Sequence, residues 1–297
     1  MRISLLFLIL ITFACVQKEP TRSPGSSSSA SGLPLKWTSL KIKQTGGLAL
    51  SVSNTTYALL GGSTSILDDM ANQWNDADSL HNFIITPMQV NIANKAHGTA
   101  LAGYHDSTMG IYTNDSWFPN ISSGTLAVTQ FYGIKRNVGS FSEYVEMTHA
   151  DIIINTRDFI FSTQNSSTRL SVASSNNTAV PYDIASVVLH EMGHFIGLGH
   201  QYSTYNSVMY PSISSTDDHR TVSSVDINTI VANYDNSVAL TAGLSIGGPS
   251  GPATNDSFAI PVENYGSNSS NQVSGTIELR KDGQCKHYIN GKLIGTH

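Results

Sequence analysis

The stretch from His190 to His200 reads HEMGHFIGLGH, so three histidines and one carboxylate fall within eleven consecutive residues. On an α-helix, residues four apart lie on one face, so His190 and His194 can turn their imidazoles toward one metal ion. Gly197 tolerates a positive φ, which can end the helix and turn the chain so that His200 supplies a third ligand. Glu191 can reach a water on that ion. Three protein ligands leave one position open, which is typical of catalytic rather than structural zinc.

This stretch resembles the HExxHxxGxxH signature of the metzincin metallopeptidases. Farther along, the run from Ser207 to Pro211 reads SVMYP and resembles the Met-turn of the matrixins, the branch that is similar to matrix metalloproteases. An isolated HExxH arises by chance, but the extended motif followed by a Met-turn is far more specific. The resemblance implies a Zn²⁺ cofactor and an apolar floor, formed by Met209, under the metal. The implied ligands are His190, His194 and His200.

The same resemblance implies that residues 37–236 form a zinc endopeptidase domain whose substrates are proteins or peptides. Zinc lowers the pKa of its bound water toward about 7, and Glu191 would accept the proton as general base. Two other functions stay open at this point. One is a surface lipoprotein that keeps the fold for adhesion without catalysis, and the other is a zinc hydrolase with non-peptide substrates. The presence of Glu191 favours catalysis, because a structural zinc site does not need that carboxylate.

Ser186 gives an indication of which substrate side chains are accepted after the cleaved bond. In matrixins the residue four positions before the first zinc histidine can reach the pocket for the side chain just after the cleaved bond. A small side chain there predicts an open pocket that accepts Leu, Met or larger apolar residues, since burial stabilises by roughly 0.8 kcal/mol per methylene. The alternative is that Ser186 faces solvent or takes part in capping the helix from Asp183.

The N-terminus predicts export. Residues 1–14 form a short charged and then apolar segment, too short for the roughly 20 apolar residues of a membrane span. They lead into Cys15 in a sequence that resembles a bacterial lipobox, which implies a lipid anchor at the cell envelope. The alternative is an ordinary secretory signal. Residues 15–36 are rich in Ser and indicate a flexible tether.

Composition bounds the rest. The 297 residues are 40% hydrophobic, enough for a full core, and the net charge of −5 gives no reason to expect nucleic acid. We expect a monomer. Residues 237–297 could form a small β module, a pendant hairpin or a tail. The other histidines, such as His105 and His149, lack the close spacing of a second metal site.

Hydrophobic periodicity predicts an α+β fold, with a mixed twisted sheet and three helices over residues 65–77, 183–196 and 223–234. Residues 126–129 would occupy the edge strand beside the cleft, by resemblance to metzincins. The expected strands are Met88–Ile92, Met109–Thr113, Thr125–Thr129 and Asp151–Asn155.

Overall fold

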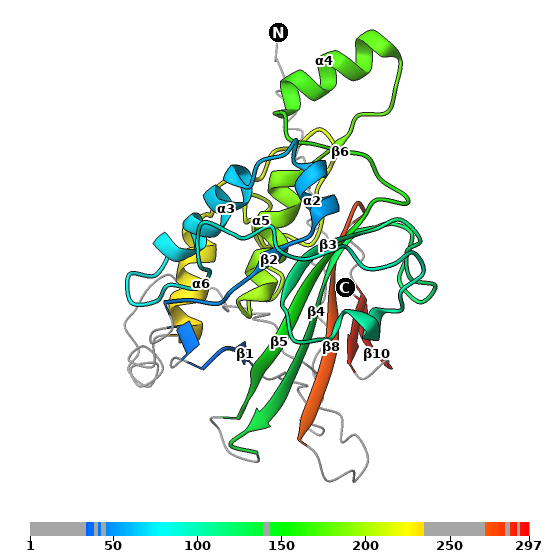
Figure 1. Ribbon diagram of the computed structural model, residues 1–297. Coiled ribbons are helices and arrows are strands. Elements are labelled where there is room, and N and C mark those ends of the chain that lie inside the picture. The colour runs from blue at the N-terminus through cyan, green and yellow to red at the C-terminus, as the bar shows by residue number, and fades with distance from the viewer. Residues whose placement is uncertain are drawn as a thin grey trace, which may run out of the picture.

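The computed structural model describes residues 34–38, 41–42, 46–138, 143–234, 271–282, 286–289 and 292–296. They form one mixed sheet with helices packed on it, so the predicted α+β class is confirmed (Figure 1). The predicted signal segment, Cys15 and most of the tether lie outside these residues. Within the described part, no helix is long and apolar enough to cross a membrane.

The sheet runs in the order β10-β9-β8-β4-β5-β3-β2, with β1 also paired to β5. Most neighbours near its middle are antiparallel, whereas β1, β2 and β3 pair in parallel. Its strands are β1 (Leu35–Lys36), β2 (Ser51–Val52), β3 (Gly110–Asn114), β4 (Thr125–Arg136), β5 (Tyr144–Asn155), β8 (Gln272–Arg280), β9 (Lys286–Ile289) and β10 (Lys292–Thr296). A separate pair joins β6 (Phe161–Ser162) to β7 (Tyr182–Asp183).

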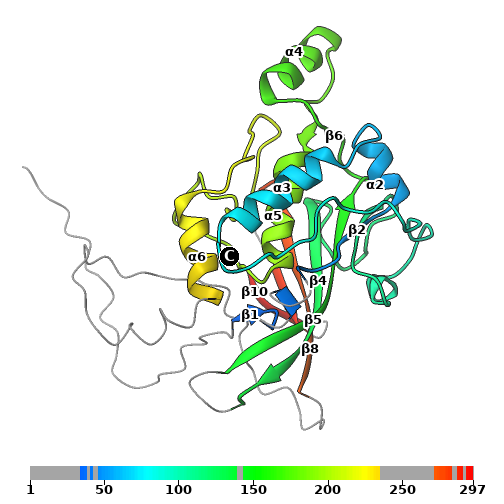
Figure 2. The ribbon, with the colours of Figure 1, turned by 60° about the vertical axis from the view of Figure 1, so that its left-hand side comes forward.

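Helices α3, α5 and α6 lie together beside the sheet, and α5 packs directly on β4 and β5 (Figures 1 and 2). The α-helices are α2 (Asn54–Leu59), α3 (Ser65–Asp76), α4 (Ser166–Asn176), α5 (Ile184–Phe195) and α6 (Ser224–Tyr234), with a short 3₁₀ turn η1 (Leu101–Tyr104). The three predicted helices are confirmed as α3, α5 and α6. Helices α2 and α4 were not predicted, although the side chains of Ser53 and Asn165 cap them in the ordinary way.

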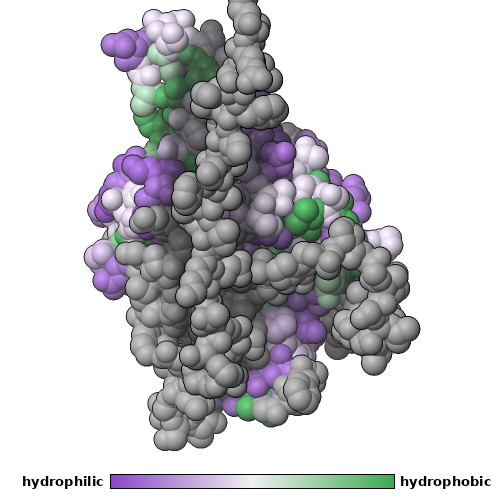
Figure 3. Space-filling model, turned by 180° about the vertical axis from the view of Figure 1, so that it is seen from behind, coloured by the Kyte–Doolittle hydropathy of each residue, from purple (hydrophilic) through white to green (hydrophobic). Residues whose placement is uncertain are grey.

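Helix α4 projects from one end of the molecule, where hydrophobic surface gathers in the view from behind (Figures 2 and 3). Two of its apolar side chains, Leu170 and Val172, are exposed, as is Ile160 before it. Its mostly polar sequence has no continuous apolar stripe, which explains why helical periodicity did not reveal it.

Two strand predictions need correction. Met88–Ile92 is not a strand, because its pairing with β2 is too sparse for a ladder. Its carbonyls accept the N–H groups of Val52 and Asn54, and it forms a single bridge, to Ser53. The second correction concerns residues 126–129, which were expected at an edge. They lie in β4 between β5 and β8, so the described C-terminal strand β8 continues the sheet of the predicted catalytic domain.

Candidate metal centre

Helix α5 is fixed at its start by a buried carboxylate. Asp183 accepts the N–H of Ser186 at 3.1 Å, which satisfies one of the free amides of the first turn. The guanidinium of Arg220 donates to both oxygens of Asp183, at 2.6 and 2.8 Å. Because every residue of α5 is buried, this paired cap anchors a helix that has no solvent-facing side.

The same helix ends at Gly197, as the sequence predicts. Its φ of +95° lies in the left-handed region that side chains avoid. The N–H of Leu198 reaches the carbonyl of Gly193 at 2.9 Å, and the N–H of Gly197 reaches that of His194 at 2.9 Å. This pair of bonds is a Schellman motif, which reverses the chain sharply and carries it back to His200.

The turn brings His190, His194 and His200 together. One ligand atom from each lies within 4.8 Å of the others, and this is the one such cluster among the described residues. The Nε2 atoms of His194 and His200 are 3.1 Å apart. Bonds of about 2.0 Å to a tetrahedral zinc would separate two ligand nitrogens by about 3.3 Å, so the spacing fits that ion.

Hydrogen bonds on the opposite ring nitrogens orient two of these imidazoles. His190 Nδ1 lies 2.6 Å from the Val208 carbonyl, and His194 Nδ1 lies 2.8 Å from the Leu198 carbonyl. Each Nδ1–H therefore donates, which leaves the Nε2 lone pair for a metal. Burial lowers the pKa of His190 to about 4, so that ring is neutral near pH 7. Its buried Nε2 has no hydrogen-bond partner in the structure, as expected of a metal ligand.

Met209 packs on the helix that carries His190 and His194. A Cβ added at Gly193 would come within 2.3 Å of Met209 Sδ, so the thioether lies directly against α5 at Gly193. The turn itself is held by Asp226 of α6, whose carboxylate accepts from the Ser207 hydroxyl and, at 3.0 Å, from the Val208 N–H. Because Val208 in turn fixes His190, Asp226 positions a ligand through two contacts.

Glu191 is fully buried next to the three histidines. The Thr129 hydroxyl of β4 donates to its Oε2 at 2.6 Å and lies 3.1 Å from its carbonyl oxygen. Burial raises the pKa of Glu191 to about 8 and the nearby Glu278 adds to the rise. The hydrogen bond from Thr129 and the nearby backbone of Leu279 oppose it. The Thr129 hydroxyl thus holds one oxygen of the carboxylate, whereas the other, Oε1, is buried without a hydrogen-bond partner among the described residues.

Ser186 lies in the first turn of α5 and is 1% exposed. Its hydroxyl donates to Asp183 and accepts the N–H of His219 at 2.7 Å. The side chain therefore takes part in the helix cap and also supports the loop that follows the Met-turn.

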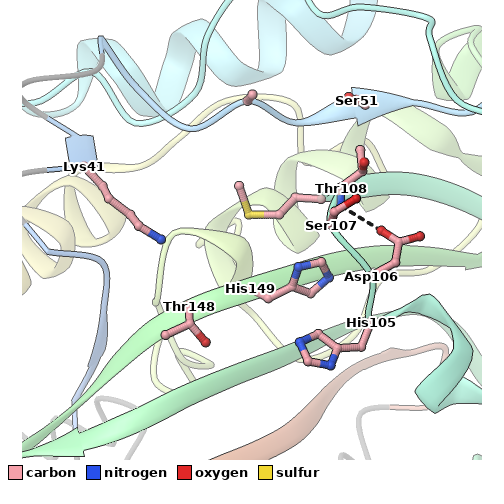
Figure 4. A pocket seen from close by; sticks show the side chains of 10 residues that line it. Lys41, Ser51, His105, Asp106, Ser107, Thr108, Thr148 and His149 are labelled. Atoms are coloured by element: carbon pink, nitrogen blue, oxygen red, sulfur yellow. Dashed lines mark hydrogen bonds between the residues drawn. The ribbon is translucent and has the colours of Figure 1, made fainter.

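A separate pocket lies on the β3 side of the sheet, lined by His105, His149 and Asp106 among others (Figure 4). The ring centroids of His105 and His149 are 4.8 Å apart, a proximity that the spacing of these residues in the sequence did not predict. His149 Nε2 lies 2.6 Å from Asp151, and His105 stacks on Tyr132. These rings are thus occupied by hydrogen-bond and stacking contacts.

Sequence reasoning missed Thr129, Asp226 and Leu279. Asp226 had a signal, since it stands at the last position of the capping box that begins at Ser223. Thr129 and Leu279 had none, because the packing of α5 on β4 brings Thr129 to Glu191 and the pairing of β8 with β4 brings Leu279 there.

Comparison with protein families matches residues 158–235 to the Matrixin model. Comparison with curated proteins gives no match for the chain. The matched segment contains α5, the turn at Gly197, the Met-turn and α6, which are the parts that build the histidine cluster. This match and this geometry identify residues 158–235 as a matrixin-like segment of the metzincin type.

Proposed function

We propose that the chain is a zinc-dependent endopeptidase that hydrolyses protein or peptide substrates, with Glu191 as general base. The observation that carries the proposal is the convergence of His190, His194 and His200 beside a buried carboxylate. Zinc at this position would activate water and polarise the substrate carbonyl. The three histidines would hold the ion, and Glu191 would take the water proton and pass it to the leaving amine.

Thr129 supports this role for Glu191. Its hydroxyl is anchored on β4 and donates to Oε2, so it limits rotation of the carboxylate. A base that is already oriented loses little entropy in reaching the reactive geometry. Met209 and Asp226 would act indirectly, by positioning the ligands. Met209 contacts helix α5, which carries His190 and His194, and Asp226 contacts the Met-turn at Val208.

One observation favours the alternative of a non-catalytic protein that keeps the fold for binding. Glu191 and His194 are 0% exposed, and His190 and His200 are 2% and 3% exposed, which leaves no route for a substrate in this conformation. A purely structural zinc would nevertheless need no adjacent carboxylate, and a closed four-ligand set is typical of such sites. The cluster has three ligands and no fourth among the described residues, which supports the catalytic proposal.

The test is hydrolysis of casein or gelatin by the purified chain before and after treatment with a chelator, over long incubations. We expect activity that disappears with the chelator and returns with zinc. His200→Ala should lower zinc affinity, because one of three ligands is lost. His97→Ala is the matched control, since its side chain is 75% exposed and outside the cluster. Equal zinc affinity in the two variants would refute the ligand assignment.

Export and anchoring belong to the proposal as well. The lipobox-like sequence before Cys15 supports a lipoprotein held at a bacterial envelope. Several acyl chains would anchor the protein stably, whereas one binds only marginally. Cys15→Ser should therefore move the protein to the soluble fraction, and wild-type protein found soluble with an N-terminus past residue 15 would contradict the anchor.

A further inference from the structure

We propose that strand β8 is a built-in inhibitor, which occupies the substrate cleft of the metal centre and must leave before a substrate can bind. This inference rests on the proposed function and concerns the regulation of the same site. It starts from the observation that all three histidines and Glu191 are buried, although a peptidase must admit an extended peptide to them.

Strand β8 covers the free edge of β4. It pairs antiparallel with β4 over most of its length, from Gln272 opposite Ile134 to Leu279 opposite Ala127. An extended peptide that adds to an exposed sheet edge makes this same kind of ladder. Because β8 uses the edge N–H and C=O groups of β4, a second strand cannot pair there at the same time.

The end of β8 lies at the metal centre. The backbone of Leu279 comes close enough to the carboxylate of Glu191 to lower its pKa. On the other side, the N–H of Arg280 donates to the Pro211 carbonyl at 3.2 Å, and Arg280 forms a parallel bridge with Ser212. The strand thus fills the slot between β4 and the segment that follows the Met-turn.

The neighbouring side chains seal the slot. Ile277 and Leu279 are 0% and 1% exposed and belong to the main hydrophobic core. Glu278 accepts the Thr125 hydroxyl at 2.8 Å, which ties β8 to the first residue of β4. Substrate binding therefore requires these contacts to be broken, and β8 competes directly with the peptide.

Loosening β8 should raise activity. Leu279→Pro removes the backbone N–H close to Glu191 and disrupts the strand. Hydrolysis of a fluorogenic peptide by the full-length, zinc-loaded variant should increase by about tenfold or more, as expected when a closed state is no longer dominant. The matched control is Gln272→Pro, the same change at the exposed first residue of β8, which should stay within about twofold of wild type.

A second variant gives a test that does not depend on how Leu279→Pro folds. The N–H of Lys135 donates to the carbonyl of Asn271, so these two residues form a hydrogen-bonded pair of the β4–β8 ladder. Hydrogen-bonded and non-hydrogen-bonded pairs alternate along an antiparallel ladder. Gln130 and Thr276, five pairs farther along, therefore form a non-hydrogen-bonded pair. Cysteines at such a pair are close enough for a disulfide. In a background with Cys15→Ser and Cys285→Ser, Gln130→Cys with Thr276→Cys should be inactive when oxidised and regain activity, by about tenfold or more, on reduction.

Binding of a fluorescent peptidyl hydroxamate to the zinc-loaded protein separates this inference from the proposed function. Binding that is tight to Leu279→Pro, weaker and alike for wild type and the reduced pair, and weakest for the oxidised pair supports inhibition by β8 even if no variant hydrolyses peptides. Hydrolysis that occurs equally in the oxidised and reduced pair, or hydroxamate binding that is equal in both, would overturn it.

Discussion

Replacing Gly197 with alanine tests the turn that delivers the third histidine. At a φ of +95° any side chain is strained, and left-handed backbone costs roughly 1–2 kcal/mol. The new Cβ would also lie 2.3 Å from the carbonyl oxygen of Leu35. That oxygen cannot move easily, because Leu35 pairs with Val145 in the sheet and its carbonyl accepts the Asn233 side chain at 2.9 Å.

Forcing atoms into a packed site costs about 1–3 kcal/mol, so we expect Gly197→Ala to lose about 2–5 kcal/mol of unfolding free energy in urea. Gly61→Ala is the matched control, since Gly61 has a φ of +74° and open space where the Cβ would be. It should lose only the strain of about 1–2 kcal/mol. Zinc affinity should fall in Gly197→Ala alone, because His200 follows the turn. Equal stability losses in the two variants would refute the reasoning.

The remaining predictions concern the helix that carries the ligands. In Gly193→Ala the added Cβ meets Met209 Sδ at 2.3 Å and Trp74 at 2.9 Å. We therefore expect the free energy of unfolding in urea to fall by about 1–3 kcal/mol. A free energy equal to that of wild type would mean that Met209 does not pack tightly on α5. Ser186→Val should narrow any pocket after the cleaved bond and reduce cleavage before large apolar residues in a peptide library. Ser186→Ala, which loses the same hydroxyl without adding bulk, is its control. Matching cleavage profiles for the two would show that Ser186 only caps the helix.

Local sequence was enough to predict the cluster of three histidines. The ligands His190 and His194 lie on one helix and His200 follows the glycine turn, so spacing and backbone preference decide their placement. The three predicted helices follow for the same reason, since each has an apolar face, and Asp183 and Ser223 cap the starts of α5 and α6. The Matrixin match covers this same part of the chain.

The surroundings of the site could not be predicted in this way. Thr129 reaches Glu191 because α5 packs on β4, and Leu279 reaches it because β4 pairs with a strand that lies about 150 residues farther along the sequence. Alternation of apolar residues in β8 indicates a strand but does not say which edge it joins. His105 and His149 likewise meet through tertiary packing, which no local spacing encodes.

The most direct test of the whole account is zinc content and peptide hydrolysis measured on the same samples of wild type and Glu191→Ala, each in the Leu279→Pro background. We predict that both proteins bind one zinc per chain and that only the protein with Glu191 hydrolyses the peptide. Hydrolysis at the same rate without Glu191, or active protein without zinc, would contradict the account.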